Sequence, residues 1–137
     1  MASRSVVLAV VGVTAGGKTS LAEALAERLD AEVVCADSRQ VFRDLEIGTG
    51  KPSRGERGAR PHHGFDLWGI QERPTAGAYG AAARSTCDEI HARGRIPLLV
   101  GGSGLYLRAA RSGLSEEPPP SPLLRAQLAA ELESTSP

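Results

Sequence analysis

Residues near the amino terminus have the types and spacing needed to bind phosphate. Gly12–Thr19 fits the pattern G-x-x-x-x-G-K-[ST], in which glycines let backbone amides turn toward phosphate oxygens. Lys18 supplies a positive charge on a long stem, and the Thr19 hydroxyl can ligate Mg²⁺. The pattern predicts a diphosphate- or nucleotide-binding loop with Mg²⁺ as cofactor, without singling out ATP. The candidate residues are Gly12, Val13, Thr14, Ala15, Gly16, Gly17, Lys18 and Thr19.

A carboxylate follows the next apolar segment. Glu32–Ala36 is typical of a short buried strand, so Asp37 is expected at the edge of an open α/β sheet where ligands bind. Asp37 could hold Mg²⁺ through water, accept a proton from an incoming nucleophile, or cap the next turn. Ser38, Arg39 and Gln40 add donors and acceptors suited to a base edge or a phosphate. The residues alone leave these alternatives open.

The elements that must position these residues alternate between strands and helices. Dense valines predict a fully buried first strand, and leucines at helical spacing (Leu21, Leu25, Leu29) predict the inward face of the first helix. Alternation of this kind implies an α/β fold with a parallel sheet and right-handed crossovers. Together with the phosphate loop, the expected fold is a P-loop NTPase-like parallel sheet flanked by helices, truncated before a helical insertion domain. The expected strands are Ser5–Val11, Glu32–Ala36, Phe65–Ile70 and Ile96–Val100. The expected helices are Lys18–Leu29 and one from a Thr75 cap to about Arg93, with Tyr79, Ala83, either Thr86 or Cys87, and Ile90 facing inward.

The composition changes after Leu114. Residues 1–114 are expected to form the α/β core, and residues 115–137 a Pro-rich connector followed by the start of a truncated helical segment. Within the second part, Leu123–Leu132 is typical of a short amphipathic helix.

Charge and cysteine content set broader limits. Sixteen basic and sixteen acidic residues cancel, although the stretch from Arg39 to Arg60 carries six basic and three acidic side chains and is locally positive. Cys35 and Cys87 form no disulfide framework and are expected to be small core residues in a reducing cytoplasm. No run is long enough to span a membrane, so we expect a cytoplasmic monomer with no membrane partner.

Four further motifs follow the phosphate loop in order: Asp37–Gln40, Ile47–Ser53, Pro61–His63 and Gly101–Tyr106. No single motif is decisive. The ordered set closely resembles the tRNA dimethylallyltransferases (tRNA isopentenyltransferases), and the resemblance extends from Val6 to about Leu132.

The resemblance implies a reaction and roles for individual residues. A dimethylallyl group would pass from dimethylallyl diphosphate to N6 of the adenosine 3′ of the anticodon in tRNA. Thr14–Thr19 would contact the diphosphate, with Lys18 and Thr19 stabilising its charge. Asp37 would take the N6 proton. The tRNA anticodon stem-loop would be contacted by Asp37, Ser38, Arg39, Gln40 and Ser103, the last at a position that is usually threonine in the family.

The chain departs from the family pattern in two ways. Val13 replaces the usual proline and Gly16 the usual serine, changes that a backbone cradle can absorb. Family members also carry a helical insertion and a C-terminal part that grip the anticodon stem-loop, so we expect this chain alone to be a poor catalyst.

Other functions remain open at this stage. A small-molecule kinase or an adenylate isopentenyltransferase could use the same loop, and a truncated chain could bind diphosphate without turnover. His62 and His63 are expected to anchor a loop rather than bind a metal, and Trp68 and Tyr106 to pack in the core.

Overall fold

The computed structural model describes residues 6–57, 60–115 and 121–135. Within these residues a four-stranded sheet has the order β1-β4-β2-β3, and every neighbouring pair is parallel. The predicted parallel α/β sheet is confirmed. The strands are β1 (Leu8–Val11), β2 (Ala31–Cys35), β3 (His62–His63) and β4 (Ile96–Gly101), and the helices are α1 (Lys18–Leu29), α2 (Arg54–Arg57), α3 (Ala76–Ala92), α4 (Gly104–Ser112) and α5 (Pro122–Thr135).

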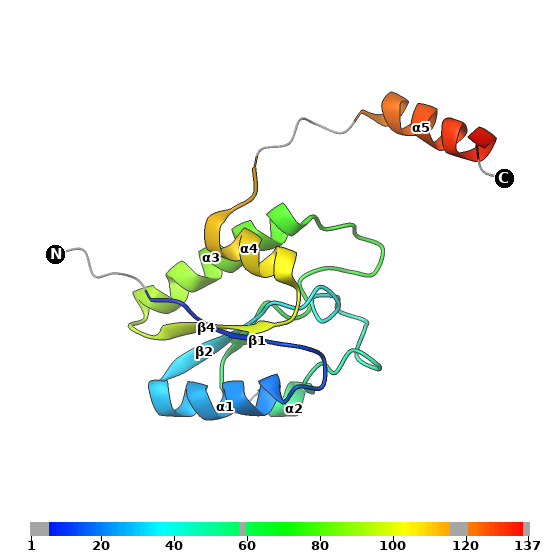
Figure 1. Cartoon of the computed structure of the whole chain (residues 1–137). Helices are drawn as coiled ribbons and strands as arrows, with labels where there is room; N and C mark the ends of the chain where they lie inside the picture. Colours follow the sequence, from blue (N-terminus) through cyan, green and yellow to red (C-terminus); the bar gives the residue numbers. More distant parts are fainter. Residues whose placement is uncertain (1–5, 58–59, 116–120, 136–137) are drawn as a thin grey trace.

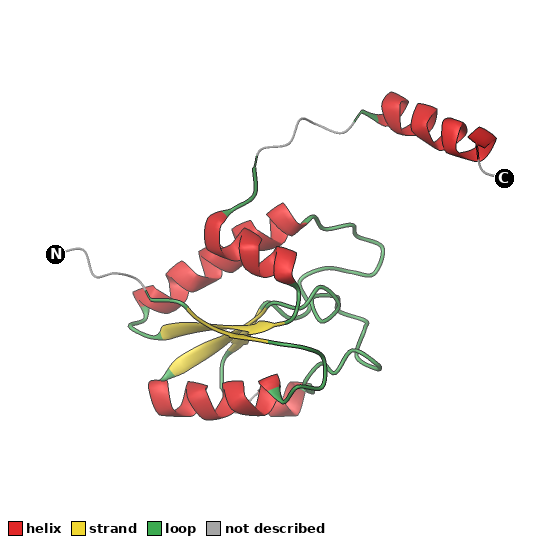
Figure 2. Cartoon of the chain, in the orientation of Figure 1, coloured by secondary structure: helices red, strands yellow, loops and turns green. Residues whose placement is uncertain are grey.

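Helices cover both faces of the sheet (Figures 1 and 2). α1 lies on one face, and α3 and α4 lie on the other. Successive residues of a strand point to opposite faces, so Val33 and Leu98 join the cluster under α1 while Val34 and Leu99 join the cluster under α3 and α4. The two central strands therefore supply both halves of the core.

The buried face of α1 differs from the predicted one. Ala22 and Ala26 are buried against the sheet, whereas Leu21 and Leu29 are exposed and Leu25 packs only partly. Two alanines one turn apart form a stripe of their own, and their short side chains let the helix approach the strands closely. The buried stripe of this helix is therefore centred on the two alanines, and Leu25 lies at its margin.

Strand β1 lies at the edge of the sheet. In the described part of the chain it pairs with β4 on one side only, and Val11 is 59% exposed. The prediction of a fully buried strand over Ser5–Val11 is wrong, and Ser5 itself lies outside the described residues. A hollow of about 960 Å³ runs beside this edge, lined by side chains of β1, α3 and α4.

The third strand is shorter and earlier than predicted. Phe65–Ile70 forms only an isolated bridge between Trp68 and Phe42. Gly64 and Asp66 have φ angles of 78° and 57°, in the left-handed region that interrupts an extended chain. β3 is instead His62–His63.

The two histidines of β3 point to different partners. Nε2 of His62 lies 2.7 Å from Glu23 Oε1 on α1, and Nε2 of His63 lies 2.6 Å from Glu32 Oε2 on β2. The predicted anchoring role is confirmed, because the pair ties this strand to two separate elements.

The second long helix follows its prediction closely. Thr75 Oγ1 accepts a hydrogen bond from the Ala78 amide at 3.1 Å. Tyr79, Ala83 and Ile90 are buried as predicted, and of the two alternatives Cys87 is buried whereas Thr86 is only partly so. Tyr106 of α4 stacks on Tyr79 with 4.1 Å between ring centroids. A Cβ on Gly80 would lie 2.6 Å from the Ala109 carbonyl oxygen, so this glycine lets α3 and α4 touch through their backbones.

The carboxyl-terminal helix α5 has no buried residue. Leu124, Leu128 and Leu132, which lie on one side of the amphipathic helix predicted over Leu123–Leu132, are exposed. No helix in the described residues has the length and apolar character required to cross a bilayer.

Candidate functional site

The phosphate-loop sequence connects β1 to α1, as the motif requires. Ala15 and Gly17 have φ angles of 60° and 74°, which turn the loop back toward the helix. No side chain among the described residues caps the first turn of α1, so its amides remain available at the positive end of the helix dipole. The Lys18 ammonium donates to the Val13 carbonyl at 2.6 Å and lies across the loop. The loop therefore offers amides and one ammonium to an anion.

A cleft of about 370 Å³ brings the three predicted catalytic residues together. Lys18, Thr19 and Asp37 all line it, so the loop and the end of β2 face one space. Its other lining residues are Thr14, Ala15, Gly16, Gly17, Gln40, Thr49, Gly50, Val100 and Gly101. Gly12 and Val13 lie at the start of the loop, outside the lining. The larger hollow beside β1 contains no residue of the phosphate loop, so chemistry favours the smaller cleft.

One oxygen of Asp37 caps the turn that follows β2. Oδ1 accepts from the Arg39 amide at 2.8 Å and from the Gln40 amide at 3.3 Å. In the described part of the chain, no hydrogen bond engages Oδ2. The capping role weighed from the sequence is therefore present, and it orients the carboxylate so that the second oxygen remains available for a proton or a hydrated metal ion.

The ends of β2 and β4 are tied together beside the cleft. The Ser38 amide donates to Ser103 Oγ at 2.9 Å, and the Ser103 amide donates to the Ala36 carbonyl at 3.3 Å. A Cβ on Gly101 would lie 2.1 Å from the same carbonyl oxygen, so only glycine allows this approach. The structure thus brings Ser38 and Ser103 into contact, while the Arg39 side chain is exposed.

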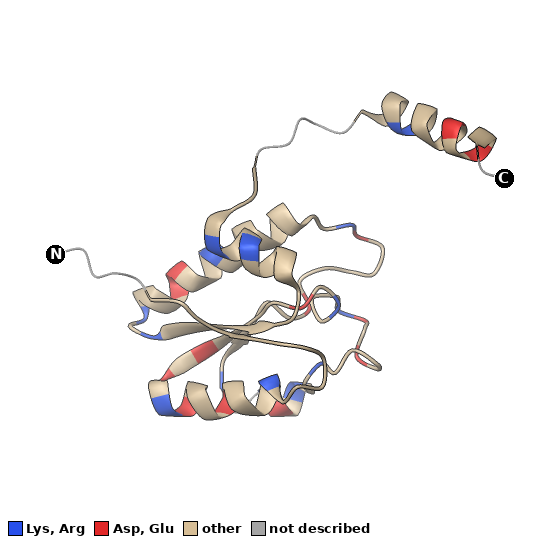
Figure 3. Cartoon of the chain, viewed as in Figure 1, with Lys and Arg blue, Asp and Glu red and all other residues tan. Residues whose placement is uncertain are grey.

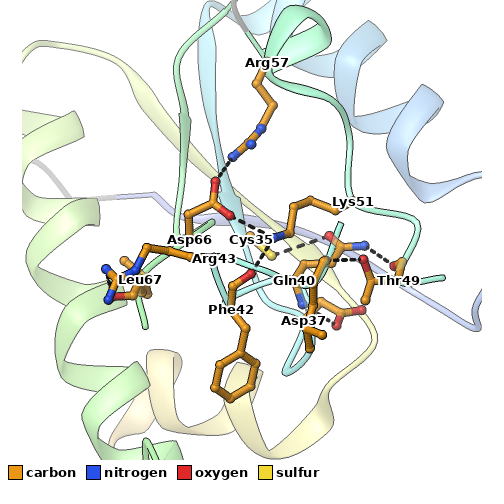
Figure 4. A network of polar contacts seen from close by, with 11 residues as sticks. Cys35, Asp37, Gln40, Phe42, Arg43, Thr49, Lys51, Arg57, Asp66 and Leu67 are labelled. Atoms are coloured by element: carbon orange, nitrogen blue, oxygen red, sulfur yellow. Dashed lines mark hydrogen bonds and ion pairs between the residues drawn. The ribbon is translucent and has the colours of Figure 1, made fainter. Parts of the chain in front are cut away.

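Gln40 has partners inside the protein. Its Nε2 donates to the Thr49 carbonyl at 2.9 Å, and its Oε1 lies 3.7 Å from Cys35 Sγ (Figure 4). Burial raises the pKa of the Cys35 thiol to about 12, which keeps the thiol protonated as a donor. Thr49 and Gly50 also line the cleft, although no functional role was predicted for them from the sequence. The signal for them was the pair of glycines, Gly48 and Gly50, in the Ile47–Ser53 motif.

The cleft offers oxygen ligands suited to Mg²⁺. The described residues contain no cluster of three or more His, Cys, Asp or Glu side chains that could hold a metal. The Thr19 hydroxyl and the Asp37 carboxylate nevertheless line the same cleft. Mg²⁺ is commonly held by one or two protein oxygens together with phosphate oxygens and water, so these residues fit it.

Most of the basic stretch between Arg39 and Arg60 is paired with acidic side chains. Figure 3 shows basic and acidic residues side by side in this part of the chain. The pairs are Arg43–Glu72, Lys51–Asp66, Arg57–Asp66 and Arg60–Glu27. Asp66, Glu72 and Glu27 lie outside the stretch, so the local positive charge counted from the sequence is partly neutralised by the fold.

Two family models match the chain. The model described as IPP transferase matches residues 40–137, and the model described as isopentenyl transferase matches residues 5–59. The chain belongs to the IPP transferase family. The recognition made from the ordered motifs is therefore confirmed, and the kinase alternative loses its support.

Individual IPP-transferase relatives are similar over nearly the whole chain. The tRNA dimethylallyltransferase of Salinispora arenicola is 51% identical over 131 residues, which are 96% of this chain and 38% of the relative. The tRNA dimethylallyltransferase of Acidothermus cellulolyticus is 48% identical over 136 residues, which are 99% of this chain and 42% of the relative. The chain thus spans about two fifths of the length of these relatives.

Solved structures agree with this assignment. The full-length tRNA isopentenylpyrophosphate transferase from Bacillus halodurans matches with a TM-score of 0.79 and 36% identity, over 97% of this chain and 44% of that one. A eukaryotic dimethylallyltransferase described as acting on tRNA matches with a TM-score of 0.76 and 32% identity, over 96% of this chain and 33% of that one. The fold of this IPP-transferase chain is therefore that of the tRNA isopentenyltransferases.

Proposed function

We propose that this chain supplies the donor site of a tRNA dimethylallyltransferase, which transfers a dimethylallyl group from dimethylallyl diphosphate to N6 of the adenosine 3′ of the anticodon in tRNA. The observation that carries the proposal is the single cleft lined by Lys18, Thr19 and Asp37. The names of the similar proteins, which act on tRNA with a dimethylallyl or isopentenyl donor, support it.

Leaving-group stabilisation is the first task of the site. As the bond between allylic C1 and the diphosphate oxygen breaks, negative charge collects on the diphosphate. The loop amides and the Lys18 ammonium are preorganised donors for that charge. The Lys18 ammonium would exchange its bond to the Val13 carbonyl for one to a phosphate oxygen. Mg²⁺ held by Thr19 would supply further charge neutralisation.

Proton removal is the second task. The lone pair of N6 forms the new bond to C1, and the N6 proton must then leave. Asp37 Oδ2 is the acceptor proposed here, because Oδ1 is already held by two amides. An adenosine stacked in the anticodon loop cannot reach this cleft, so the base must be turned out of its stack.

The tRNA side of the site is proposed to be the surface around Ser38, Arg39 and Ser103. These residues border the cleft at the ends of β2 and β4. We propose that they contact the anticodon stem-loop, with Gln40 supporting the turn. Two free, buried cysteines fit a reducing cytoplasm, and we propose that the protein acts there as a monomer.

Competition binding tests the donor assignment. Dimethylallyl diphosphate is titrated against bound fluorescent pyrophosphate analogue in the presence of Mg²⁺, and ATP is titrated in parallel. We expect the prenyl diphosphate to displace the analogue at lower concentration than ATP. Equal displacement by ATP would favour a nucleotide enzyme. Prenylation of an anticodon stem-loop, followed by mass spectrometry, then separates a transferase from a chain that only binds diphosphate.

A further inference from the structure

The side chain of Lys51 is buried next to the cleft but does not line it. It is 1% exposed, and its neighbours in sequence, Thr49 and Gly50, form part of the cleft wall. A buried ammonium is costly unless its charge and its donors are matched by partners. Because burying this ammonium is costly, its position next to a ligand site suggests a role in shaping that site.

Lys51 has two partners from different segments. Its Nζ donates to Asp66 Oδ1 at 2.8 Å and to the backbone carbonyl of Phe42 (Figure 4). Asp66 is held in turn by Arg57 at 2.7 Å. Burial would raise the pKa of the Asp66 carboxyl, but the hydrogen bonds from Lys51 and Arg57 outweigh it and keep that pKa below its ordinary value. The carboxylate is therefore charged and fixed from two sides.

Among the described residues, few other hydrogen bonds hold the turn in front of Lys51. Gly48 and Gly50 have φ angles of 78° and 66°, and Ile47 is 96% exposed at the outer part of the segment. The inner contacts are two hydrogen bonds of Thr49, whose carbonyl accepts from Gln40 and whose hydroxyl donates to the Leu45 carbonyl. A segment with two left-handed glycines and an exposed tip has many alternative conformations, so the buried end decides which one is populated.

We propose that Lys51 is a positioning residue, whose ammonium clamps the Phe42 carbonyl to Asp66 and thereby holds the Thr49–Gly50 turn as part of the wall of the donor cleft. This inference rests on the proposed function for its ligand. Lys51 acts through the turn and through Gln40, not by touching diphosphate. If the clamp is lost and the turn is in its binding conformation about a tenth of the time, the apparent Kd rises about tenfold.

The test compares Lys51→Met with a control of similar chemistry elsewhere. Arg93 donates to the buried carboxylate of Glu32 at the opposite end of β2, and Glu32 keeps other partners just as Asp66 keeps Arg57. Arg93→Met therefore also removes a cation from a buried carboxylate, but far from the cleft. Asp66→Asn, which keeps the shape, serves as a second variant if Lys51→Met folds poorly.

Two measurements are made on the whole chain: hydrogen exchange of the peptide covering residues 40–51, and calorimetric binding of inorganic pyrophosphate with Mg²⁺. For Lys51→Met we expect faster exchange in that peptide and a Kd for pyrophosphate about tenfold higher than that of the wild type. Arg93→Met should show neither change, even where its Tm is lowered by the same amount. Unchanged exchange, or a Kd equal to that of the control, overturns the inference. A wild-type chain that fails to bind pyrophosphate overturns the proposed function instead, while faster exchange in the variant still supports the clamp.

Discussion

Glu32 and Asp37 stand at the two ends of strand β2 and have opposite surroundings. Glu32 is 1% exposed and is held by Arg93 at 2.7 Å, Arg95 at 3.4 Å and His63 at 2.6 Å. Asp37 is half-buried, and the hydrogen bonds found for it in the described residues come from two backbone amides. One carboxylate is neutralised by cations of the protein, and the other faces a cleft beside Lys18. The difference separates a charge that stabilises the fold from a charge available to a ligand.

The largest expected effect is that of Asp37→Asn on group transfer. The amide oxygen still accepts from the turn, so the fold is kept, but the proton acceptor is lost. We expect the rate of prenylation to fall roughly 10²–10⁴-fold. Single-turnover transfer to an anticodon stem-loop measures it, in a protein that joins this segment to the part present in the longer relatives. Pyrophosphate affinity should stay within about twofold. A full rate in this variant would remove the distinction drawn between the two carboxylates.

Glu32→Gln should lower the stability of the fold and leave ligand binding almost unchanged, the opposite of the pattern expected for Asp37→Asn. The pKa of Glu32 is lowered to about 2, chiefly by the hydrogen bonds from Arg93, with burial opposing and His63 adding to the lowering. We expect the substitution to lower the free energy of unfolding near neutral pH by about 3 kcal/mol, with pyrophosphate affinity nearly unchanged. Urea denaturation with matched calorimetry checks both halves.

The same carboxylate predicts a pH dependence. Because the folded pKa lies below the ordinary value of 4.5, the stabilisation is complete above pH 4.5 and is lost as the pH falls toward about 2. Denaturation midpoints recorded across that window should fall in the wild-type chain and change less in Glu32→Gln. Parallel curves for the two proteins would contradict the assignment.

Lys18→Ala comes next in size. Loss of one charge-assisted hydrogen bond to the diphosphate should weaken pyrophosphate binding by roughly 10–100-fold. Stability should change little, because among the described residues the ammonium bonds only the Val13 carbonyl in this exposed loop. Calorimetry with Mg²⁺ measures the affinity, and equal Kd values for the two proteins would argue against the loop as the donor site.

Ser103→Ala should have the smallest effect. It removes the acceptor of the Ser38 amide, which is exposed and can bond water instead. We expect a loss of about 1 kcal/mol or less in the free energy of unfolding and no change in pyrophosphate affinity. A weaker affinity for the anticodon stem-loop, measured by fluorescence anisotropy, would support a role of Ser103 as a tRNA contact. A large loss of stability would instead show that Ser103, like Glu32, mainly stabilises the fold.

Sequence patterns predicted the chemistry of the site better than its packing. The phosphate loop could be located because its function demands glycines, a lysine and a hydroxyl at fixed spacing between a strand and a helix. The helix beginning at Thr75 was found because its cap and its inward face agree. The buried face of α1 was missed because alanine gives a weak hydrophobic signal even where close approach to a sheet requires it.

Other features depended on contacts between distant segments. The edge position of β1 was not visible, because an apolar parallel strand has the same composition at an edge and at a centre. The Lys51–Asp66 pair joins residues fifteen positions apart, on either side of α2 and β3. Local sequence carries no record of such a pairing.

The open side of β1 has a consequence for handling the protein. Within the described residues β1 has no neighbour on its second side, and a parallel edge of that kind beside exposed valines is a template on which a second polypeptide can add a strand, which is a common start of aggregation. Around the neighbouring hollow the exposed arginines Arg84, Arg108 and Arg111 outnumber the one exposed acidic residue, Asp88, so two such edges would bring together faces of net positive charge. Their repulsion is screened within about 10 Å at 0.1 M salt. Dilute buffers of low ionic strength should therefore keep the chain dispersed, and concentrated salt should promote its self-association.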